Sequence, residues 1–403
     1  MPDLKSSYDH VIVGGGVAAD KAARAVHEKA PDATIAILSA DADGPVYRPA
    51  LTKDLWHGDD PDPASQDLNT AEETGADLHT GTPVTAIDTT AHSVTTADGA
   101  TVGYGTLLLA TGSSPRRLGA GQDARVAYLR SVADYRHLRD LVQEGTRTAV
   151  VGGGYIGSEI AAGLSAAGAE VTLFHSGDRL LGGMFPESVS THVAEVFAEK
   201  GIRLTGGFRL AGIDAGEHLT LTAEDGRSET ADVAVLGLGA QLETSLAREA
   251  GLELDGDFVV VDEQLRTSAP DVWAAGDIIR FTDPLLGDRH VEHIDHAEAS
   301  GEAAGRNMVG GQEKYEYTPL FYSDLFDDGY EAVGRLDASL ETVETWDVDH
   351  GAAVVHYLEG SEVVGVLLWN TWDAVPTARE VIAASQAGRL SPDELAQQIT
   401  PGG

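Results

Sequence analysis

Two glycine-rich stretches constrain the fold of this chain more than any other feature. They read VIVGGGVAAD at 11–20 and AVVGGGYIGSE at 149–159. Each follows a short apolar run, leads into alanine-rich sequence and is followed by a second apolar run. This order predicts a strand, a tight turn, a helix and another strand, which is the unit that binds a dinucleotide.

In the first stretch, Tyr8–Val13 is the expected first strand and residues 34–38 are the second. Gly14 would make the turn, Gly16 would let the backbone approach a pyrophosphate, and the small Ala19 would let the helix pack closely on the strand. The free N–H groups at the helix N-terminus would then face the phosphates.

The second stretch repeats this pattern. The run Thr148–Val151 precedes Gly152, Gly154 and Gly157, and a second strand-like run follows at Glu170–Phe174. Two complete units in one chain predict two bound dinucleotides. The alternative is that one unit is a fold element that has lost its ligand.

Two further motifs bracket the second glycine stretch. LLLATGSSPR at 107–116 ends an apolar strand in Ala110, Thr111 and Gly112, and TSAPDVWAAGDIIRF at 267–281 places Asp277 at the end of a buried strand. The second nucleotide domain is therefore expected to be inserted into the first. The sequence predicts an α/β fold with two Rossmann-like domains.

Together these motifs resemble a known family. ATG and AAGD flanking GGGYIG look like the flavoproteins that bind two dinucleotides, which include ferredoxin reductases. The stretches VYRPALTKDLW at 46–56, HVEHIDHAEASGEAAGRNMVGG at 290–311 and PLFYSDLFDDGYEAVG at 319–334 resemble apoptosis-inducing factor and its bacterial relatives. The resemblance runs from about residue 8 to residue 340. It implies FAD on the first unit and a nicotinamide cofactor on the second.

The resemblance also implies three domains. Residues 1–116 and 242–314 would form a discontinuous FAD-binding domain, residues 117–241 the NAD(P)-binding domain, and residues 315–403 a C-terminal α+β interface domain. The last segment alternates strand-like runs with turns and ends in helix-like sequence. We expect Trp369 and Trp372 to belong to its core.

The lysine of the KDLW stretch is one of six in the chain. The resemblance implies that Lys53 reaches the N5 side of the flavin and pairs with Glu159 of the second glycine helix. A buried ammonium needs such a partner or it loses its proton. Tyr155 would cover the flavin until the nicotinamide displaces it, or it would simply end the strand. Glu292 and His293 would lie near the nicotinamide.

The remaining expected contacts are with the cofactors. Asp277 would bind the ribityl or pyrophosphate region of FAD, and Asp41 would take the ribose contact for which the relatives usually carry Glu. The aromatic pair Phe321-Tyr322 would lie near the flavin ring. The N-terminus of a helix expected at Asp295–Val309 would point at the pyrimidine edge. The other cofactor-binding residues expected are Arg48, Asp295, His296 and Gly239.

Three histidines follow one another in steps of three, at His290, His293 and His296. This spacing invites a metal hypothesis, but helical metal ligands usually lie four residues apart and need a further ligand. We expect no metal here. After the second strand of the second unit, His175 and Arg179 stand where enzymes specific for NADH usually carry an acid. These residues favour NADPH, or use of both NADPH and NADH.

The composition limits the partners. Sixty-five acidic residues face 27 basic ones, for a net charge of −38, and such a field repels nucleic acid and anionic membranes. A salt-adapted proteome or a GC-rich genome would each account for the acidity. The chain has no cysteine, which excludes redox disulfides and thiolate-ligated clusters. Redox chemistry must belong to an organic cofactor. No apolar run approaches the roughly 20 residues that span a bilayer, and we expect a cytoplasmic protein.

The expected function is an FAD-dependent NAD(P)H oxidoreductase that passes electrons to a ferredoxin, a rubredoxin or a quinone. Ferredoxins are commonly acidic, so the arginine-rich stretch 116–147 is the expected docking patch, unless its arginines are ordinary helix-surface pairs. The alternative is a redox-gated interaction protein like apoptosis-inducing factor, with slow NAD(P)H oxidation. The sequence is also compatible with a homodimer.

Overall fold

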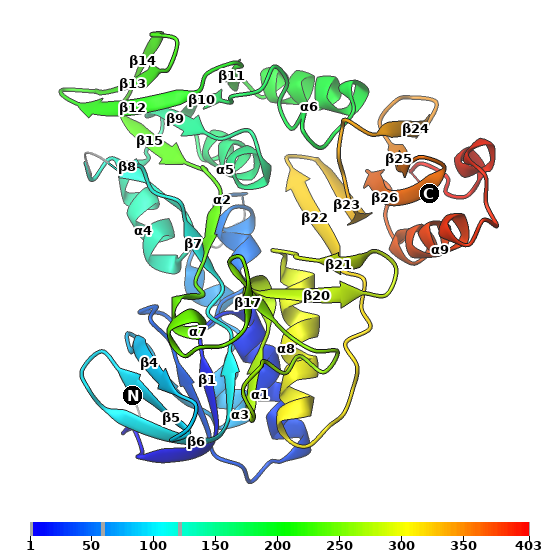
Figure 1. Ribbon diagram of the computed structural model, residues 1–403. Coiled ribbons are helices and arrows are strands. Elements are labelled where there is room, and N and C mark those ends of the chain that lie inside the picture. The colour runs from blue at the N-terminus through cyan, green and yellow to red at the C-terminus, as the bar shows by residue number, and fades with distance from the viewer. Residues whose placement is uncertain (1–2, 58–60, 120–122, 403) are drawn as a thin grey trace. The chain divides into compact units, whose positions relative to one another are not determined.

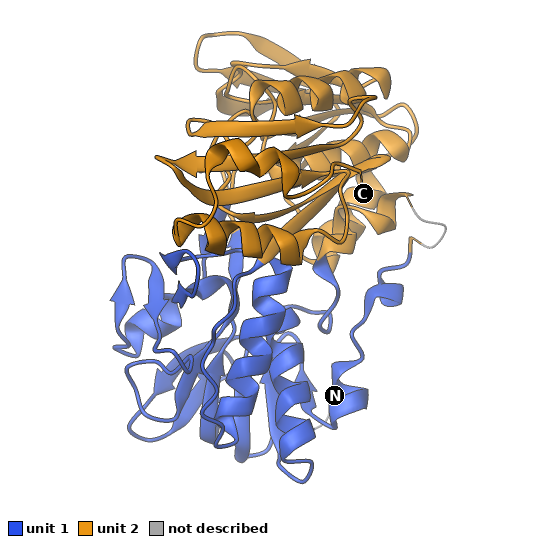
Figure 2. Ribbon diagram, turned by 90° about the vertical axis from the view of Figure 1, so that its right-hand side faces the viewer, with its two compact units in different colours: residues 1–48, 62–114, 240–319 blue, residues 49–61, 115–239, 320–403 orange. Residues whose placement is uncertain are grey.

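The computed structural model describes residues 3–57, 61–119 and 123–402. Its contacts divide the chain into two compact units (Figure 2), each built from segments that are far apart in the sequence. Unit 1 comprises residues 1–48, 62–114 and 240–319, and unit 2 comprises residues 49–61, 115–239 and 320–403. The chain therefore enters and leaves each unit more than once.

A seven-stranded sheet forms the centre of unit 1 (Figure 1). Its order is β3-β2-β1-β6-β5-β4, and β19 also pairs with β6. Strands β1, β2, β3, β6 and β19 run parallel, whereas β4 and β5 are antiparallel to their neighbours. The bounds are β1 Ser7–Val13, β2 Ile35–Leu38, β3 Asp77–His79, β4 Val84–Asp88, β5 Ser93–Thr96, β6 Thr101–Leu109 and β19 Val272–Ala274.

Two long helices pack together in unit 1, α1 (Val17–Lys29) and α8 (Ile294–Met308) (Figure 1). A Cβ on Gly301 or Gly305 of α8 would overlap the backbone of Ala18 or Ala22 of α1. Glycine therefore sets how closely the two helices approach. The shorter helices of this unit are η2 Pro63–Gln66, α3 Thr70–Thr74, α7 Ser245–Glu249 and η3 Gly276–Ile278.

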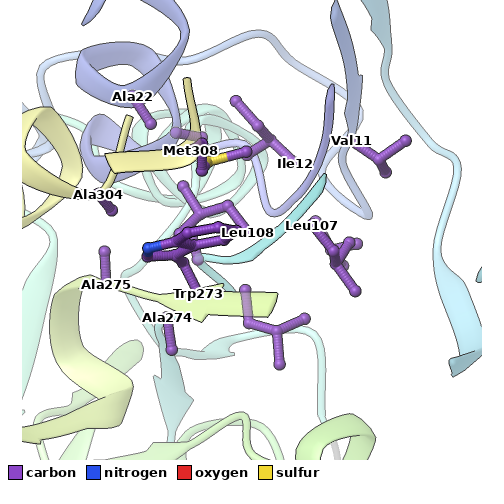
Figure 3. Packing of buried hydrophobic residues seen from close by; sticks show 14 of the residues in the cluster. Val11, Ile12, Ala22, Leu107, Leu108, Trp273, Ala274, Ala275, Ala304 and Met308 are labelled. Carbon is purple, nitrogen blue, oxygen red and sulfur yellow. The ribbon is translucent and has the colours of Figure 1, made fainter. Parts of the chain in front are cut away.

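The core of unit 1 lies between the central sheet and these helices. Figure 3 shows the indole of Trp273 beside Leu108, with Met308 of α8 close to Ile12 of β1. Leu108 and Ile12 are fully buried, because β1 and β6 are inner strands covered on both faces. The near-continuous apolar runs of the sequence reflect this double burial.

Two smaller sheets complete unit 1. The order β17-β18-β20-β21 forms one of them, and β7 pairs with β16 where the chain passes between the units. Their bounds are β17 Leu254–Asp255, β18 Phe258–Val260, β20 Ile279–Asp283, β21 Gly287–Arg289, β7 Ser113–Pro115 and β16 Ala240–Leu242.

Unit 2 contains a second parallel sheet, of order β11-β10-β9-β15-β8. Its strands are β8 Val126–Ala127, β9 Arg147–Val151, β10 Glu170–Phe174, β11 Arg203–Thr205 and β15 Val233–Leu236. An antiparallel meander follows, with β12 Leu210–Ala215, β13 Leu219–Ala223 and β14 Ser228–Ala231. The accompanying helices are α4 Val132–Leu141, α5 Tyr155–Ala166 and α6 Glu187–Glu199.

The C-terminal segment of unit 2 is a five-stranded antiparallel sheet of order β22-β23-β26-β25-β24. Its strands are β22 Leu320–Leu325, β23 Asp328–Gly334, β24 Glu341–Trp346, β25 Ala353–Glu359 and β26 Glu362–Trp369, followed by α9 Val375–Gln386 and η4 Pro392–Gln397. Two short helices from earlier in the chain, η1 Arg48–Leu51 and α2 Asp54–His57, lead from unit 1 into unit 2.

The predicted α/β class with two parallel nucleotide-type sheets is confirmed. Trp369 is buried as expected, but the expectation of a core position is wrong for Trp372, which is 45% exposed. None of the helices in the described ranges combines the length and the apolar character needed to cross a membrane.

Candidate cofactor-binding and active site

The first glycine turn joins β1 to α1 in unit 1. Gly14 has φ +126°, and a Cβ there would overlap the carbonyl oxygen of Ala110 on the neighbouring strand. Gly16 is the N-cap of α1, and no side chain caps the helix. The first N–H groups of α1 are therefore not used by a side-chain cap, which is the arrangement that receives a phosphate. Ala19 is fully buried in α1.

A cationic side chain lies over this turn. The guanidinium of Arg48 is the nearest group to a Cβ placed on Gly16, at 3.9 Å. Its Nη2 donates to Asp41 Oδ2 at 2.8 Å, and Asp41 follows the end of β2. The predicted residues Gly16, Arg48 and Asp41 thus lie together in unit 1. A pyrophosphate would meet backbone N–H groups and a guanidinium here.

The ATG and AGD motifs meet at one end of the same sheet, because β6 and β19 are parallel neighbours. Ser113 Oγ donates to Asp277 Oδ2 at 2.7 Å, across 164 positions of sequence. Thr111 Oγ1 donates to the backbone oxygen of Glu243 at 2.5 Å, and the Glu243 N–H donates to Gly112 at 2.9 Å. These bonds fix the turn that follows β6, where open α/β sheets bind ligands.

The three histidines near α8 have different partners. His290 Nε2 lies 2.8 Å from the backbone oxygen of Asp277. His293 is the N-cap of α8, where its Nδ1 accepts the Asp295 N–H at 3.4 Å. His296 Nδ1 lies 2.8 Å from the Tyr315 hydroxyl, so each of the three rings contacts a different group. The helix begins at Ile294, one residue before the predicted start.

His296 lies in the interior of unit 1. Its ring is 0% exposed and its Nδ1 lies 2.8 Å from the hydroxyl of Tyr315. Burial lowers the pKa of His296 to about 3. Asp295 Oδ1 accepts from the Tyr317 hydroxyl at 2.9 Å, and Glu292 is exposed.

The second glycine turn joins β9 to α5 in unit 2. Gly152 has φ +133°, and a Cβ there would overlap the carbonyl oxygen of Gly237. Gly157 packs on Gly152 with no room for a Cβ, whereas a Cβ on Gly154 would meet nothing within 4 Å. Gly154 also caps α5 without a side chain. The helix N-terminus therefore opens into free space, which fits a second pyrophosphate.

The two residues that favoured NADPH are less available as cations than the sequence suggested. His175 is 6% exposed, packed beneath Gly153, and burial lowers its pKa. Arg179 Nη1 lies 3.0 Å from Glu187 Oε2. Gly239 follows β15 with φ +89°, and its carbonyl accepts the Arg116 N–H at 3.0 Å.

The predicted ion pair between Lys53 and Glu159 is present in unit 2. Lys53 Nζ lies 3.2 Å from Glu159 Oε1, and the two residues are 7% and 8% exposed. Thr52 Oγ1 donates to Glu159 Oε2 at 2.6 Å, and Ser323 Oγ donates to Glu159 Oε1 at 2.5 Å. Both carboxylate oxygens are thus hydrogen-bonded, as a buried charge requires.

Aromatic rings and a second carboxylate surround this pair. Lys53 Nζ lies 4.3 Å from the centre of the Tyr322 ring and 3.8 Å from Asp324 Oδ2. Tyr155, at the start of α5, makes an edge contact with Phe321 at 5.7 Å between ring centres. Burial raises the pKa of the Tyr155 hydroxyl, which therefore stays protonated. The cluster holds a positive charge in aromatic surroundings.

Sequence reasoning did not find Thr52, Ser323 or Asp324. Thr52 and Ser323 lie 107 and 164 positions from Glu159, and each is adjacent in sequence to a residue that was predicted. Adjacency to Lys53 and Tyr322 was the only local signal. A hydroxyl next to a predicted site residue has no pattern that identifies its distant partner.

All seven arginines of the stretch 116–147 interact with other groups of the protein. Arg125 pairs with Asp123 at 2.9 Å and Arg147 pairs with Asp232 at 2.7 Å. The guanidinium of Arg139 lies 5.1 Å from the centre of the Trp56 ring. The charges of Arg125 and Arg147 are therefore balanced by carboxylates within unit 2.

Comparison with known proteins places this geometry in a family. A family model described as pyridine nucleotide-disulphide oxidoreductase matches residues 8–301. The chain belongs to that family. A second model, described as apoptosis-inducing factor, mitochondrion-associated, C-term, matches residues 304–350. The predicted resemblance is confirmed.

Individual relatives of the family cover nearly the whole chain. The ferredoxin–NAD(+) reductase component of the anthranilate 1,2-dioxygenase system of Burkholderia cepacia is 36% identical over 94% of this chain and 95% of its own. Apoptosis-inducing factor 1 of Dictyostelium discoideum is 31% identical over 93% of this chain and 78% of its own. The reductase in a covalent putidaredoxin reductase–putidaredoxin complex superimposes with a TM-score of 0.86 at 26% identity, over 98% and 96% of the two chains.

The residues present fit the cofactors of this family, FAD and a nicotinamide dinucleotide. Two helices begin at glycine turns without side-chain caps, and one turn carries Arg48 while the other opens into free space. The chain contains no cysteine, so this member has no thiol for the disulphide chemistry in the family description.

Proposed function

We propose that this protein is an FAD-dependent NAD(P)H reductase that passes electrons to a small one-electron carrier of the ferredoxin type. The observation that carries the proposal is the pair of uncapped glycine-turn helices, together with a buried ammonium–carboxylate pair that joins the turn between η1 and α2 to α5. Two dinucleotides in a protein without thiols leave hydride transfer between nicotinamide and flavin as the supported chemistry. The similarity to a ferredoxin–NAD(+) reductase along nearly the whole chain supports the same acceptor class.

Bound FAD would supply the acceptor for a hydride from a nicotinamide and the donor of single electrons to a carrier. In unit 1, Gly14, Gly16 and Arg48 would hold its pyrophosphate, and Asp277 would fix its ribityl region. In unit 2, the turn at Gly152 and Gly154 would hold the nicotinamide dinucleotide. We propose residues 1–116 and 242–314 as the FAD domain, 117–241 as the NAD(P) domain and 315–403 as the interface domain.

The cluster around Lys53 would contribute to the reaction through its fixed charges. Glu159 pairs with the buried ammonium, and Thr52 and Ser323 each donate a hydrogen bond to the carboxylate. A preorganised positive charge stabilises negative charge that develops nearby during a reaction. We propose that the Lys53 ammonium performs this role beside the N5 side of the flavin.

The direct test loads the purified chain with FAD and mixes it with NADH or NADPH without oxygen. The flavin absorbance should be lost within seconds and should return when ferredoxin, rubredoxin, a quinone or ferricyanide is added. A colourless protein that cannot be reconstituted with FAD would overturn the proposal. We also propose a cytoplasmic location, which cell fractionation would check.

The match of residues 304–350 to the C-terminal model of apoptosis-inducing factor favours a second candidate. In this function the chain is a redox-gated interaction protein that oxidises NAD(P)H slowly. Size exclusion before and after anaerobic reduction separates the two. A change in mass with slow reoxidation in air favours the gated protein, and rapid reoxidation by a carrier favours the reductase.

A further inference from the structure

Trp372 is an exposed aromatic side chain in a protein that otherwise covers its tryptophans. The residue is 45% exposed, whereas Trp56, Trp273 and Trp369 are at most 6% exposed and Trp346 is half-buried. All five tryptophans lie in the described ranges. A partly exposed indole is a candidate anchor for a partner, because tryptophan is the side chain most enriched at binding hot spots.

The loop that carries Trp372 is tied to neighbouring segments by hydrogen bonds of Asn370. Asn370 has φ +46°, and its side-chain amide donates to Asp328 Oδ1 at 2.7 Å and to the Gly351 carbonyl at 2.8 Å. Its Oδ1 accepts the Gly329 N–H at 2.8 Å. The indole therefore lies on a loop that these hydrogen bonds of Asn370 support. A preorganised anchor loses little conformational entropy when a partner binds.

Gly329 forms the floor beneath the indole. A Cβ placed there would lie 2.6 Å from Trp372 Cη2 and 2.9 Å from Asp324 Oδ1. The ring and the carboxylate thus approach each other above a residue without a side chain. Any larger residue at position 329 would displace one of them.

Carboxylates lie near the exposed ring in space or in sequence. Asp324 has a half-exposed side chain, and Asp373 is exposed and follows Trp372 directly. Asp54 is also exposed, and it acts together with Asp324 on the charge of His57, which places these three residues near one another. We call Trp372, Asp54, Asp324 and Asp373 the Trp372 surface. An aromatic anchor within an acidic rim is complementary to a basic partner.

The Trp372 surface connects directly to the buried ion pair. Asp324 Oδ1 faces the Gly329 floor, while its Oδ2 lies 3.8 Å from Lys53 Nζ. One carboxylate therefore contacts both the exposed surface and the buried ammonium. A carrier seated on Trp372 would lie one side chain away from Lys53. In the arginine-rich stretch 116–147, which the sequence favoured for docking, Arg125 and Arg147 are paired with carboxylates within unit 2.

We propose that the Trp372 surface is the docking site for the one-electron carrier, and that the docking face of this carrier is basic. The proposal rests on the proposed reductase function. It reverses the charge arrangement expected from the sequence, in which an acidic ferredoxin binds the arginine-rich stretch. The carrier inserts an apolar group against the indole, and its lysines or arginines pair with Asp54, Asp324 and Asp373.

The first experiment compares two carriers on the FAD-loaded enzyme at low salt. Cytochrome c is the basic probe, an acidic [2Fe–2S] ferredoxin is the opposite probe, and ferricyanide is the small acceptor. We expect Trp372→Ala to raise KM for cytochrome c by about tenfold or more relative to KM for ferricyanide. Trp372→Phe should restore most of the affinity. Trp346→Ala removes a half-buried tryptophan of the same unit and is the matched control.

The contribution of the carboxylates of the Trp372 surface is tested separately. Asp373→Asn should raise KM for cytochrome c and flatten its dependence on ionic strength, because one attractive charge is lost. Asp349→Asn removes an exposed carboxylate outside the Trp372 surface and should change neither. If Arg116→Glu with Arg117→Glu weakens reduction of the ferredoxin while Trp372→Ala affects neither carrier, the proposal is overturned and the arginine-rich stretch is the docking site.

Cross-linking gives a result that does not depend on turnover. A carbodiimide condenses a carboxyl group with a lysine amine with loss of water, so the FAD-loaded chain is coupled to cytochrome c and the linked peptides are mapped. Links at Asp54, Asp324 or Asp373 that disappear at high salt support the proposal, and links confined to other carboxylates overturn it. Absence of flavin reduction by NAD(P)H would instead contradict the reductase function, and the links would still decide whether this surface binds a basic protein.

Discussion

At the scale of single residues, Lys53 is distinguished from the other lysines by burial rather than by pairing. Each of the six lysines lies near a carboxylate, but the side chains of the other five are between 35% and 56% exposed. Exposed pairs of this kind contribute little to stability, because water and salt screen them. A buried pair with both carboxylate oxygens satisfied is retained for another purpose, and placing a fixed charge is the purpose that the chemistry supports.

Lys53→Met removes that charge with little change in side-chain volume. We expect the anaerobic reduction of bound FAD by NAD(P)H, followed in a stopped-flow instrument, to slow by a factor of about ten or more. Ser323→Ala, which removes one hydrogen bond to Glu159, should slow it less. Lys21→Met breaks an exposed pair with Glu298 and is the control. An unchanged rate for Lys53→Met, in a variant that melts like the parent, would remove this lysine from the mechanism.

Cofactor preference depends on Arg179 and its partner. The sequence favours NADPH, and a preference for NADH of at least tenfold in kcat/KM would contradict that expectation. Because Glu187 pairs with Arg179, we expect Glu187→Gln to raise kcat/KM for NADPH several-fold relative to NADH by freeing the guanidinium for a 2′-phosphate. Glu195→Gln, on the same helix, is the control. An unchanged ratio would show that Arg179 does not meet the adenosine ribose.

At the scale of elements, the contact between α1 and α8 has little tolerance for a larger side chain. Gly305→Ala would improve the intrinsic helix propensity by about 1 kcal/mol. A Cβ there would nevertheless overlap the backbone of Ala22 and lie 2.9 Å from Ala25 Cβ, so the helices must separate. We expect a net loss of about 1–3 kcal/mol in the free energy of unfolding, measured by urea denaturation. Gly212→Ala, where a Cβ meets nothing within 4 Å, should change it by less. A more stable Gly305→Ala would contradict this packing.

The elements that the sequence predicted are those with a local signature. Both glycine units have strands within one residue of the predicted bounds, because apolar periodicity and turn glycines are properties of neighbouring residues. The environment of single side chains was less predictable. The burial of His175 and the exposure of Trp372 depend on segments distant in sequence. The periodicity of a local sequence does not show which of its side chains a distant segment will bury.

At the scale of the whole molecule, buried histidines couple folding to pH. His296 and His356 are both 0% exposed, one in each unit, and burial lowers their pKa values to about 3 and about 4. Their ordinary value of 6.5 applies in the unfolded chain. Between these values the unfolded chain binds more protons than the folded protein. Stability is therefore complete above pH 6.5 and falls as the pH is lowered towards 4.

Each such histidine contributes a slope of up to about 1.4 kcal/mol per pH unit. We expect the free energy of unfolding, from urea denaturation at several pH values between about 6.5 and 5, to fall as the pH is lowered, with His296 and His356 each contributing up to one such slope. His10, His57, His79 and His175, whose pKa values are also lowered by burial, add to this slope, whereas most carboxyl groups titrate below this window. His356→Leu fills a strand position between Val343 and Val366 with an apolar side chain and should reduce the slope by one proton. His350→Leu, at an exposed site, should leave the slope unchanged. An equal slope in His356→Leu and the parent would mean that this imidazole is already protonated in the folded protein, and its burial among apolar strands would have to be relieved by a local opening.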